Sequence, residues 1–175
     1  MTSPGPQSAL IVEIPEAEPA VGPLRDRLDA NARLGVPAHV TVVYPFAPPA
    51  TIDAAARQRL TDLFGSVPSF GVRLDRTGWF GPDVLWLGPA DPAPFRVLTE
   101  RVVAAFPAYP PFEGRFAEVI AHLTVGQGQP VGELRAAEEA VRARLPIEAT
   151  VRAVTLLTSE PGRRWQRAAR FSLGR

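Results

Sequence analysis

The sequence predicts an α+β fold built from two similar halves, and two observations lead to this prediction. Strand-like and helix-like segments follow one another without the regular β-α-β alternation of a doubly wound parallel sheet. The chain has 175 residues and only two histidines, His39 and His122, which lie 83 residues apart. Both occur in the same setting of histidine, apolar residue, threonine and apolar residue, so each half carries one copy of a motif.

The first half is predicted to contain two strands and two helices. An apolar run over 8–14, bounded by prolines, predicts a strand. Apolar residues at helical spacing predict a helix over 21–32. The β-branched and aromatic stretch 38–46 predicts the strand that carries the first histidine. A second helix is expected over 51–64, with Thr51 as its N-cap.

The second half shows the same mixture of strands and helices. Short runs of β-formers, separated by turn signals, predict strands at 69–88 (two or three short ones), 118–126, about 147–158 and 166–173. Apolar residues at helical spacing predict helices over 94–106, where Pro94 suits the first turn, and 134–145. The second histidine therefore also falls on a predicted strand.

Composition restricts the class of protein. The chain has no cysteine, so it can form neither a disulfide nor a thiolate metal site. The net charge of +1 provides no global attraction to long nucleic acids or membranes. No apolar run approaches the ~18 residues of a membrane span, and no signal peptide is recognisable. We expect a cytoplasmic monomer with one domain over 8–175 and a flexible tail over 1–7.

The alternation of a strand gives the two motifs a shared geometry. Successive side chains point to opposite faces, so His39 and Thr41 share one face, and His122 and Thr124 do the same. A lone histidine on a strand usually has only a structural role. At this composition, the probability that both histidines occur in this setting by chance is on the order of one in ten thousand. If the halves are pseudo-symmetric, two imidazoles and two hydroxyls meet at one cleft.

These motifs resemble those of the two-histidine (2H) phosphoesterase superfamily, specifically the bacterial 2′-5′ RNA ligase family. The stretches AHVTVVYPF, GWFGPDVLWLGP and AHLTVGQG are similar to family blocks, and AVTLLTSEPGRRWQ is similar to its closing hairpin. The resemblance implies two pseudo-symmetric lobes, each an antiparallel sheet with outer helices, that face each other across a central cleft. It also implies that His39, Thr41, His122 and Thr124 are the catalytic residues.

The residue types suit phosphodiester chemistry independently of the resemblance. Two imidazoles with ordinary pKa values near 6.5 can divide the acid and base roles at neutral pH. Threonine hydroxyls can donate hydrogen bonds to phosphate oxygens on which charge develops. The sequence offers no credible metal cage, so we expect no metal and no cofactor. The resemblance implies that His39 is the acid and His122 the base.

Three aromatic residues are further candidates. Tyr44 extends the first motif strand as a candidate for substrate binding, although strict alternation points it toward the core unless the strand bends at Pro45. Trp79 is a candidate for stacking on a base, and Phe80 beside it has the same alternatives. Packing in the core or at its rim is the competing interpretation for both.

Two basic segments are candidates for substrate binding as well. Arg163, Arg164 and Trp165 lie in the predicted last hairpin turn, where they could hold a phosphate and a base. A solvated turn is the equal alternative. Arg115 precedes the second motif strand and is a similar candidate.

The leading functional hypothesis is a metal-independent phosphodiesterase. Its substrate would be a 2′,3′-cyclic phosphate on a nucleotide or a short RNA end, and no binding of long duplexes is expected. Ligation through 2′-5′ bonds, the reverse chemistry, is an alternative within the same class. A non-catalytic nucleotide- or RNA-binding module, or a structural domain with two packed histidines, would belong to other classes.

Overall fold

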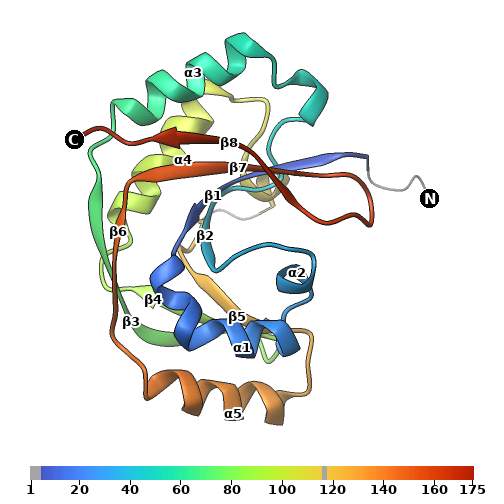
Figure 1. The fold of residues 1–175 in the computed structure, drawn as a ribbon, viewed down its shortest axis with the longest axis vertical. Helices are drawn as coiled ribbons and strands as arrows, with labels where there is room; N and C mark the ends of the chain where they lie inside the picture. The colour runs from blue at the N-terminus through green and yellow to red at the C-terminus, as the bar shows by residue number, and fades with distance from the viewer. Residues whose placement is uncertain (1–4, 116–117) are drawn as a thin grey trace.

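The structure is a computed structural model that describes residues 5–115 and 118–175. It contains two four-stranded antiparallel sheets (Figure 1), which confirms the predicted α+β fold with two lobes. The first sheet has the order β2-β1-β7-β8, formed by His39–Val43, Gln7–Glu13, Ala153–Ser159 and Gln166–Ser172. The second has the order β5-β4-β3-β6, formed by Leu123–Gln127, Val84–Pro89, Phe70–Phe80 and Ile147–Val151.

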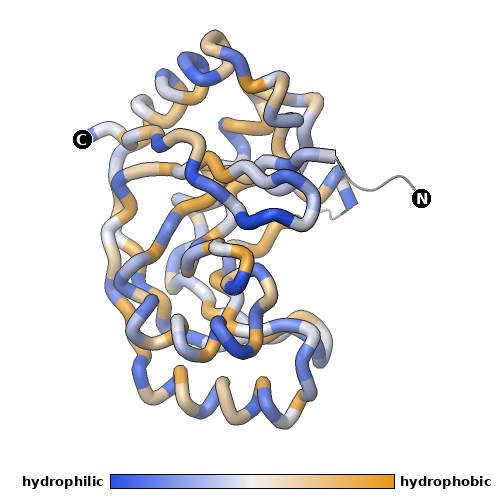
Figure 2. Tube along the Cα trace, turned by 45° about the vertical axis from the view of Figure 1, so that its right-hand side comes forward, coloured by the Kyte–Doolittle hydropathy of each residue, from blue (hydrophilic) through white to orange (hydrophobic). Residues whose placement is uncertain are grey.

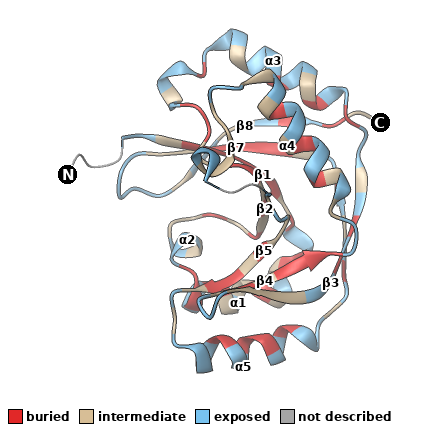
Figure 3. Cartoon of the chain, turned by 180° about the vertical axis from the view of Figure 1, so that it is seen from behind, coloured by how far each residue is buried: buried red, intermediate tan, exposed pale blue. Residues whose placement is uncertain are grey.

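Helices cover the outer face of each sheet, and each lobe takes one helix from the other half of the chain. The helices are α1 (Glu18–Leu28), α2 (Ala30–Arg33), α3 (Ala54–Gly65), α4 (Ala93–Ala105) and α5 (Val131–Arg142), with 3₁₀ turns η1 (Pro15–Ala17), η2 (Pro49–Thr51) and η3 (Pro111–Gly114). The helix α1 follows β1 but packs on β5 of the second sheet, together with α5. Conversely, α4 follows β4 but packs on β2 of the first sheet, next to α3 (Figures 1 and 3).

One apolar core fills the space between the sheets and their helices. Its members are buried on both sheets and on the inner sides of the helices, as the red segments of Figure 3 show, and they include Leu10, Val40, Leu85, Leu123, Leu60, Leu98 and Leu134. Hydrophobic residues recur among hydrophilic ones along α5 in Figure 2, as expected for a helix with one face on a sheet. Each sheet therefore keeps one face for the core and leaves the other for different contacts.

Two predicted helix boundaries are corrected by the structure. The helix predicted over 21–32 is broken at Asp29, whose backbone is extended and whose carboxylate accepts a hydrogen bond from the N–H of Asn31. The predicted cap Thr51 lies in η2 instead. Asp53 caps α3, because its Oδ1 accepts the N–H of Ala56 at 2.8 Å.

The strands also differ in their limits. The region 69–88 forms a single hairpin of β3 and β4, and its turn contains Gly81 at φ 55°. The second motif strand begins at Leu123, five residues later than predicted. The strand β1 begins at Gln7, within the predicted tail, and residues 1–4 of that tail lie outside the described residues. In the part of the chain that is described, no helix has the length and apolar character to cross a membrane.

Gly126 is required by close packing where β5 meets α1. A Cβ atom on this residue would lie 2.8 Å from the Cβ of Leu28 and 2.8 Å from Cδ2 of Leu134. The Leu134 side chain can rotate, but the Cβ of Leu28 is held by the backbone of α1. We therefore expect Gly126→Ala to destabilise the protein by about 1–3 kcal/mol through overpacking. Thermal unfolding measures this change.

Gly71→Ala is the matched control, because Gly71 also lies in a strand and has nothing within 4 Å of its Cβ position. An equal loss of stability in both variants would contradict the packing argument.

Candidate active site

The two motif strands occupy equivalent edges of the two sheets and contact each other. The strand β2 is the edge of the first sheet and β5 is the edge of the second. Each carries a β-bulge at the same place. Val42 is the extra residue after Thr41, and Val125 is the extra residue after Thr124. The similarity between the halves therefore extends beyond the motif letters to the backbone that follows them.

Both histidines are held in the same way. Nδ1 of His39 lies 2.7 Å from the carbonyl oxygen of Pro37, and Nδ1 of His122 lies 2.7 Å from that of Ile120. Since a carbonyl only accepts, Nδ1 carries the hydrogen in each ring. Nε2 is thereby left available to accept or donate a proton, according to the charge of the ring.

Burial makes both imidazoles harder to protonate. It is the main reason why the pKa of His39 is lowered to about 4, and the charges of Arg25 and His122 lower this pKa further. The Pro37 carbonyl and Asp29 act in the opposite direction. The pKa of His122 is also lowered by burial, against the effect of its backbone hydrogen bond. The charge of His122 thus acts on His39, and both imidazoles are harder to protonate than a free imidazole.

An apolar and aromatic hollow lies beside His39 on the open face of the first sheet. Its volume is about 150 Å³, and Thr41, Ile11, Leu157, Tyr44 and Trp165 are among its lining residues. Tyr44 and Trp165 meet edge to face, with ring centroids 6.1 Å apart. Flat apolar walls of this kind suit a nucleobase or another planar group.

The bulge explains why Tyr44 faces this hollow. Val42 and Val43 are both buried in the core, so the alternation shifts by one residue after Thr41. Tyr44 thereby returns to the face of His39, and its Oη donates to Oε1 of Gln7 at 3.1 Å. Strict alternation from His39 would have directed it into the core.

A second aromatic wall lies beside His122, and of its two residues the sequence indicates only Phe80 as a candidate. The ring of Phe80 lies edge-on to the imidazole at 4.8 Å between centroids, and Trp86 lies at 6.1 Å. Trp86 is the cross-strand partner of Thr124 on one side and of Gly78 on the other. A Cβ on Gly78 would lie 2.3 Å from the Trp86 ring, so the indole lies across the bare glycine.

Trp79, the other candidate for base stacking, lies on the face of β3 that packs against α5. Trp79 pairs with the buried Leu85 and so lies on the opposite face of β3 from Phe80. The guanidinium of Arg135, on α5, stacks over its ring at 4.2 Å. The competing interpretation, packing at the rim of the core, describes its position, and Phe80 is the residue that reaches His122.

The remaining candidates are divided by the structure. Trp165 lines the hollow beside His39, and its backbone N–H donates to the backbone carbonyl of Leu34 at 2.8 Å. Arg163 is exposed in the hairpin turn and does not line that hollow. Arg115 is also exposed, and it forms an ion pair with Glu113 at 2.6 Å. Neither arginine contacts a motif residue within the described part of the chain.

A buried polar cluster beneath the motifs has no signal in the sequence. Arg25 and Asp29 are 2% and 1% exposed and form an ion pair at 2.9 Å. Asp29 also accepts from the N–H of Asn31 at 3.0 Å and from Nε2 of Gln127 at 3.1 Å. This cluster joins α1, α2 and β5. Within residues 5–115 and 118–175, no group of three or more potential ligands is placed to hold a metal ion.

The pKa shifts lead to a direct test. We expect NMR titration of the free protein to show His39 titrating at about pH 4 and His122 below 6.5, the ordinary value. Added 3′-AMP should raise both values, because a nearby anion favours the charged imidazole. His39→Gln assigns the two resonances. An imidazole that titrates at or above 6.5 without ligand would contradict the burial argument.

The comparisons with known proteins agree with this geometry. A model of the 2′-5′ RNA ligase superfamily matches residues 14–163. The crystal structure of Escherichia coli LigT complexed with 3′-AMP has a TM-score of 0.65 and 17% identity, and covers 98% of this chain and 100% of that one. A crystal structure of a Thermus thermophilus protein has a TM-score of 0.63 and 18% identity, and covers 95% and 97%. A search of curated protein sequences finds no significant match. The two motifs, the fold and the extent of the family match show that the chain belongs to the 2′-5′ RNA ligase superfamily.

Proposed function

We propose that this protein is a metal-independent phosphodiesterase that opens 2′,3′-cyclic phosphates on nucleotides or short RNA ends. The observation that carries the proposal is the duplicated motif strand. His39 begins β2 and His122 immediately precedes β5, and these two edge strands contact each other. Each histidine has Nδ1 bound to a backbone carbonyl and a threonine two residues on. One imidazole can therefore act on each side of a phosphorus atom.

The reaction needs one base and one acid. A neutral imidazole accepts a proton at Nε2 from the attacking water, whose oxygen forms a bond to phosphorus. A protonated imidazole gives its Nε2 proton to the ribose oxygen as the P–O bond of the ring breaks. Thr41 and Thr124 donate hydrogen bonds to the non-bridging oxygens, on which negative charge develops. The product is a phosphomonoester. Proton exchange with water then returns both imidazoles to their original charge states.

Two arguments about the roles of the histidines point in opposite directions. The family resemblance implies that His39 is the acid and His122 the base. The stronger lowering of the His39 pKa favours His39 as the neutral base, since an acid has to be protonated before it can donate. A leaving-group test separates these assignments and is included in the experiment below.

Nucleotides are the class of substrate that the surroundings favour. The aromatic hollow beside His39 fits a base, and Phe80 and Trp86 form a second aromatic wall beside His122. Structures of E. coli LigT with 3′-AMP, with ATP and with NADP+ supply examples of nucleotide complexes on this fold.

Hydrolysis is favoured over ligation by the exposure of the site. The surrounding atoms lower the pKa values of both imidazoles, but all four motif residues keep part of their surface exposed, so water has access to the phosphate. Ligation would need water to be excluded from the same position. A binding module without activity would not need both histidines and both threonines.

The central test compares kcat/KM on adenosine 2′,3′-cyclic phosphate for the wild type, His39→Ala, His122→Ala and the double variant, all in EDTA. We expect each single variant to lose at least about 10²-fold, as is typical of general acid–base groups. The double variant should be little worse than the worse single one, because the two groups act as a unit. For the wild type, kcat/KM should depend on pH with a bell shape. The two apparent pKa values of this curve belong to the coupled pair of histidines.

A p-nitrophenyl phosphodiester of adenosine serves as the leaving-group arm, because p-nitrophenolate departs without an acid. The variant of the acid histidine should recover activity on it, whereas the variant of the base should not. Near-wild-type rates in either single variant, or loss of activity in EDTA that Zn²⁺ or Mn²⁺ restores, would refute the proposal. Circular dichroism checks that each variant folds.

The threonines provide an independent prediction. Thr41→Val and Thr124→Val remove one hydrogen-bond donor each and keep the shape of the side chain. Loss of a donor to a developing oxyanion costs about 2.7–4 kcal/mol, so we expect kcat to fall about 10²–10³-fold without unfolding. Thr61→Val is the control, because Thr61 is an exposed threonine on α3 whose hydroxyl donates only to the carbonyl of Arg57. Wild-type turnover in both motif variants would show that these threonines only favour strand formation and have no role in the reaction.

A further inference from the structure

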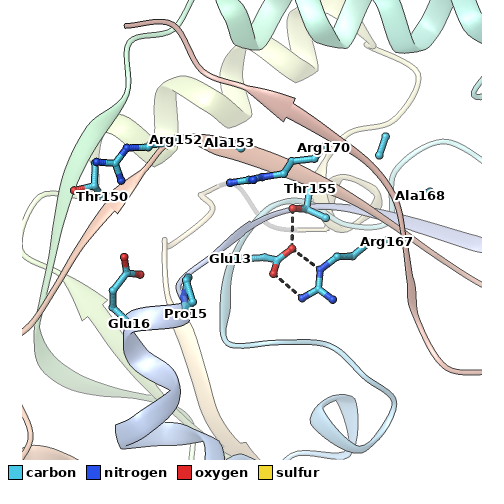
Figure 4. Close-up of a pocket in the computed structure, with 11 residues that line it drawn as sticks. Glu13, Pro15, Glu16, Thr150, Arg152, Ala153, Thr155, Arg167, Ala168 and Arg170 are labelled. Atoms are coloured by element: carbon cyan, nitrogen blue, oxygen red, sulfur yellow. Dashed lines mark hydrogen bonds and ion pairs between the residues drawn. The ribbon is translucent and has the colours of Figure 1, made fainter.

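A second, larger hollow opens on the first sheet and η1. Glu13, Thr155, Arg152, Arg167 and Arg170 point into it, as Figure 4 shows. Its volume is about 650 Å³, compared with about 150 Å³ for the hollow beside His39. Small-molecule sites in proteins occupy roughly 300–1,000 Å³. The smaller hollow is therefore too small for a whole nucleotide, and the larger one is not.

The two hollows lie on the same face of the same sheet. Glu13 is the cross-strand partner of His39. In the next row, Ile11 pairs with Thr41 on one side and with Thr155 on the other. Cross-strand partners share a face, so the surface that carries the first motif continues directly across β1 to β7. A ligand bound at His39 thus has the larger hollow beside it.

Three arginines and two glutamates, Glu13 and the exposed Glu16, line this hollow, so the balance of its charges favours an anion. Glu13 accepts from Nε and Nη2 of Arg167 at 2.9 and 2.7 Å and from the hydroxyl of Thr155 at 2.8 Å (Figure 4). The negative charge of Glu13 is therefore balanced by Arg167 within the protein. Arg152 and Arg170 are exposed, and their guanidinium groups form no hydrogen bond or close ion pair among the described residues, although the charge of Arg170 helps to lower the pKa of Glu13. Two guanidinium forks are thus available, and guanidinium matches phosphate in a two-point arrangement.

We propose that this hollow is a second phosphate subsite, which rests on the proposed function. It takes the phosphate on the 5′ side of the nucleotide whose 2′,3′-cyclic phosphate lies between the histidines. That phosphate is the one nearest to a terminal cyclic phosphate in RNA, one ribose away. The substrate is then an RNA 3′ end or a 5′-phosphorylated nucleotide, and a cyclic mononucleotide with a free 5′-hydroxyl is a poorer one.

The test compares two substrates that differ by one phosphate: adenosine 2′,3′-cyclic phosphate with a 5′-hydroxyl, and the same compound with a 5′-phosphate. We expect the wild type to prefer the 5′-phosphorylated compound by about tenfold in kcat/KM, which corresponds to about 1.4 kcal/mol. In Arg152→Ala/Arg170→Ala this ratio should fall to near one. The preference should also weaken with added salt, because exposed charges are screened.

Arg27→Ala/Arg144→Ala is the matched control. It removes the same charge from two exposed arginines of α1 and of the segment after α5, neither of which lines the hollow. Its substrate ratio should remain that of the wild type. A wild type without preference for the 5′-phosphate, or an equal loss of preference in both double variants, would overturn the proposal. Thermal unfolding shows whether the variants fold.

A binding measurement separates this subsite from the proposed activity. Calorimetry compares adenosine 3′,5′-bisphosphate with 3′-AMP on the wild type and on Arg152→Ala/Arg170→Ala. Binding of the bisphosphate that is about tenfold tighter in the wild type only, without turnover of any cyclic phosphate, would refute the proposed function and support the subsite. Equal affinities for the two ligands in the wild type would refute the subsite, whatever the activity.

Discussion

The arrangement of the candidate site depends on the buried ion pair of Arg25 and Asp29. Both side chains are almost fully withdrawn from water, and such burial is costly unless hydrogen bonds satisfy the charges. Asp29 meets this condition by accepting from Arg25, from the start of α2 and from Gln127 just after the second motif. Removal of one partner would leave an uncompensated charge, which typically costs about 3–5 kcal/mol. The pair therefore holds the second motif strand against a helix from the first half, and its charges act on His39.

The exchange of helices between the halves explains why the site lies between the lobes. Because α1 packs on β5 and α4 packs on β2, neither lobe has a complete core without the other half. The two motif strands are sheet edges, which would otherwise expose unpaired backbone groups. Their mutual contact brings His39, the first residue of β2, near His122, the residue before β5. The bulges after Thr41 and Thr124 shift the alternation of side chains by one residue in both strands.

The motif residues and the fold class could be predicted from the sequence, because both depend on local patterns: the setting of each histidine and the order of strands and helices. The aromatic surroundings could be predicted only in part, because Tyr44, Phe80 and Trp165 are candidates in the sequence but the face on which each lies is not. Alternation directs Tyr44 into the core, and one bulged residue, Val42, reverses its direction. Adjacent aromatics such as Trp79 and Phe80 are equivalent until the pairing of β3 with β4 decides which one faces His122. The role of Asp29 depends on Gln127, 98 residues away, and no local pattern carries that contact.

A chain with a net charge of +1 can still select phosphates, because the selecting charges are created or placed locally. Burial lowers the pKa of both imidazoles and so opposes their protonation in the free protein. An anion bound between them favours the charged form of one ring, so binding and proton uptake are linked. In the reaction that we propose, the acid is therefore formed when the phosphate arrives, and the base stays neutral because a second positive charge beside the first is disfavoured. Because burial lowers both pKa values, one imidazole becomes the acid and the other the base only when the phosphate binds.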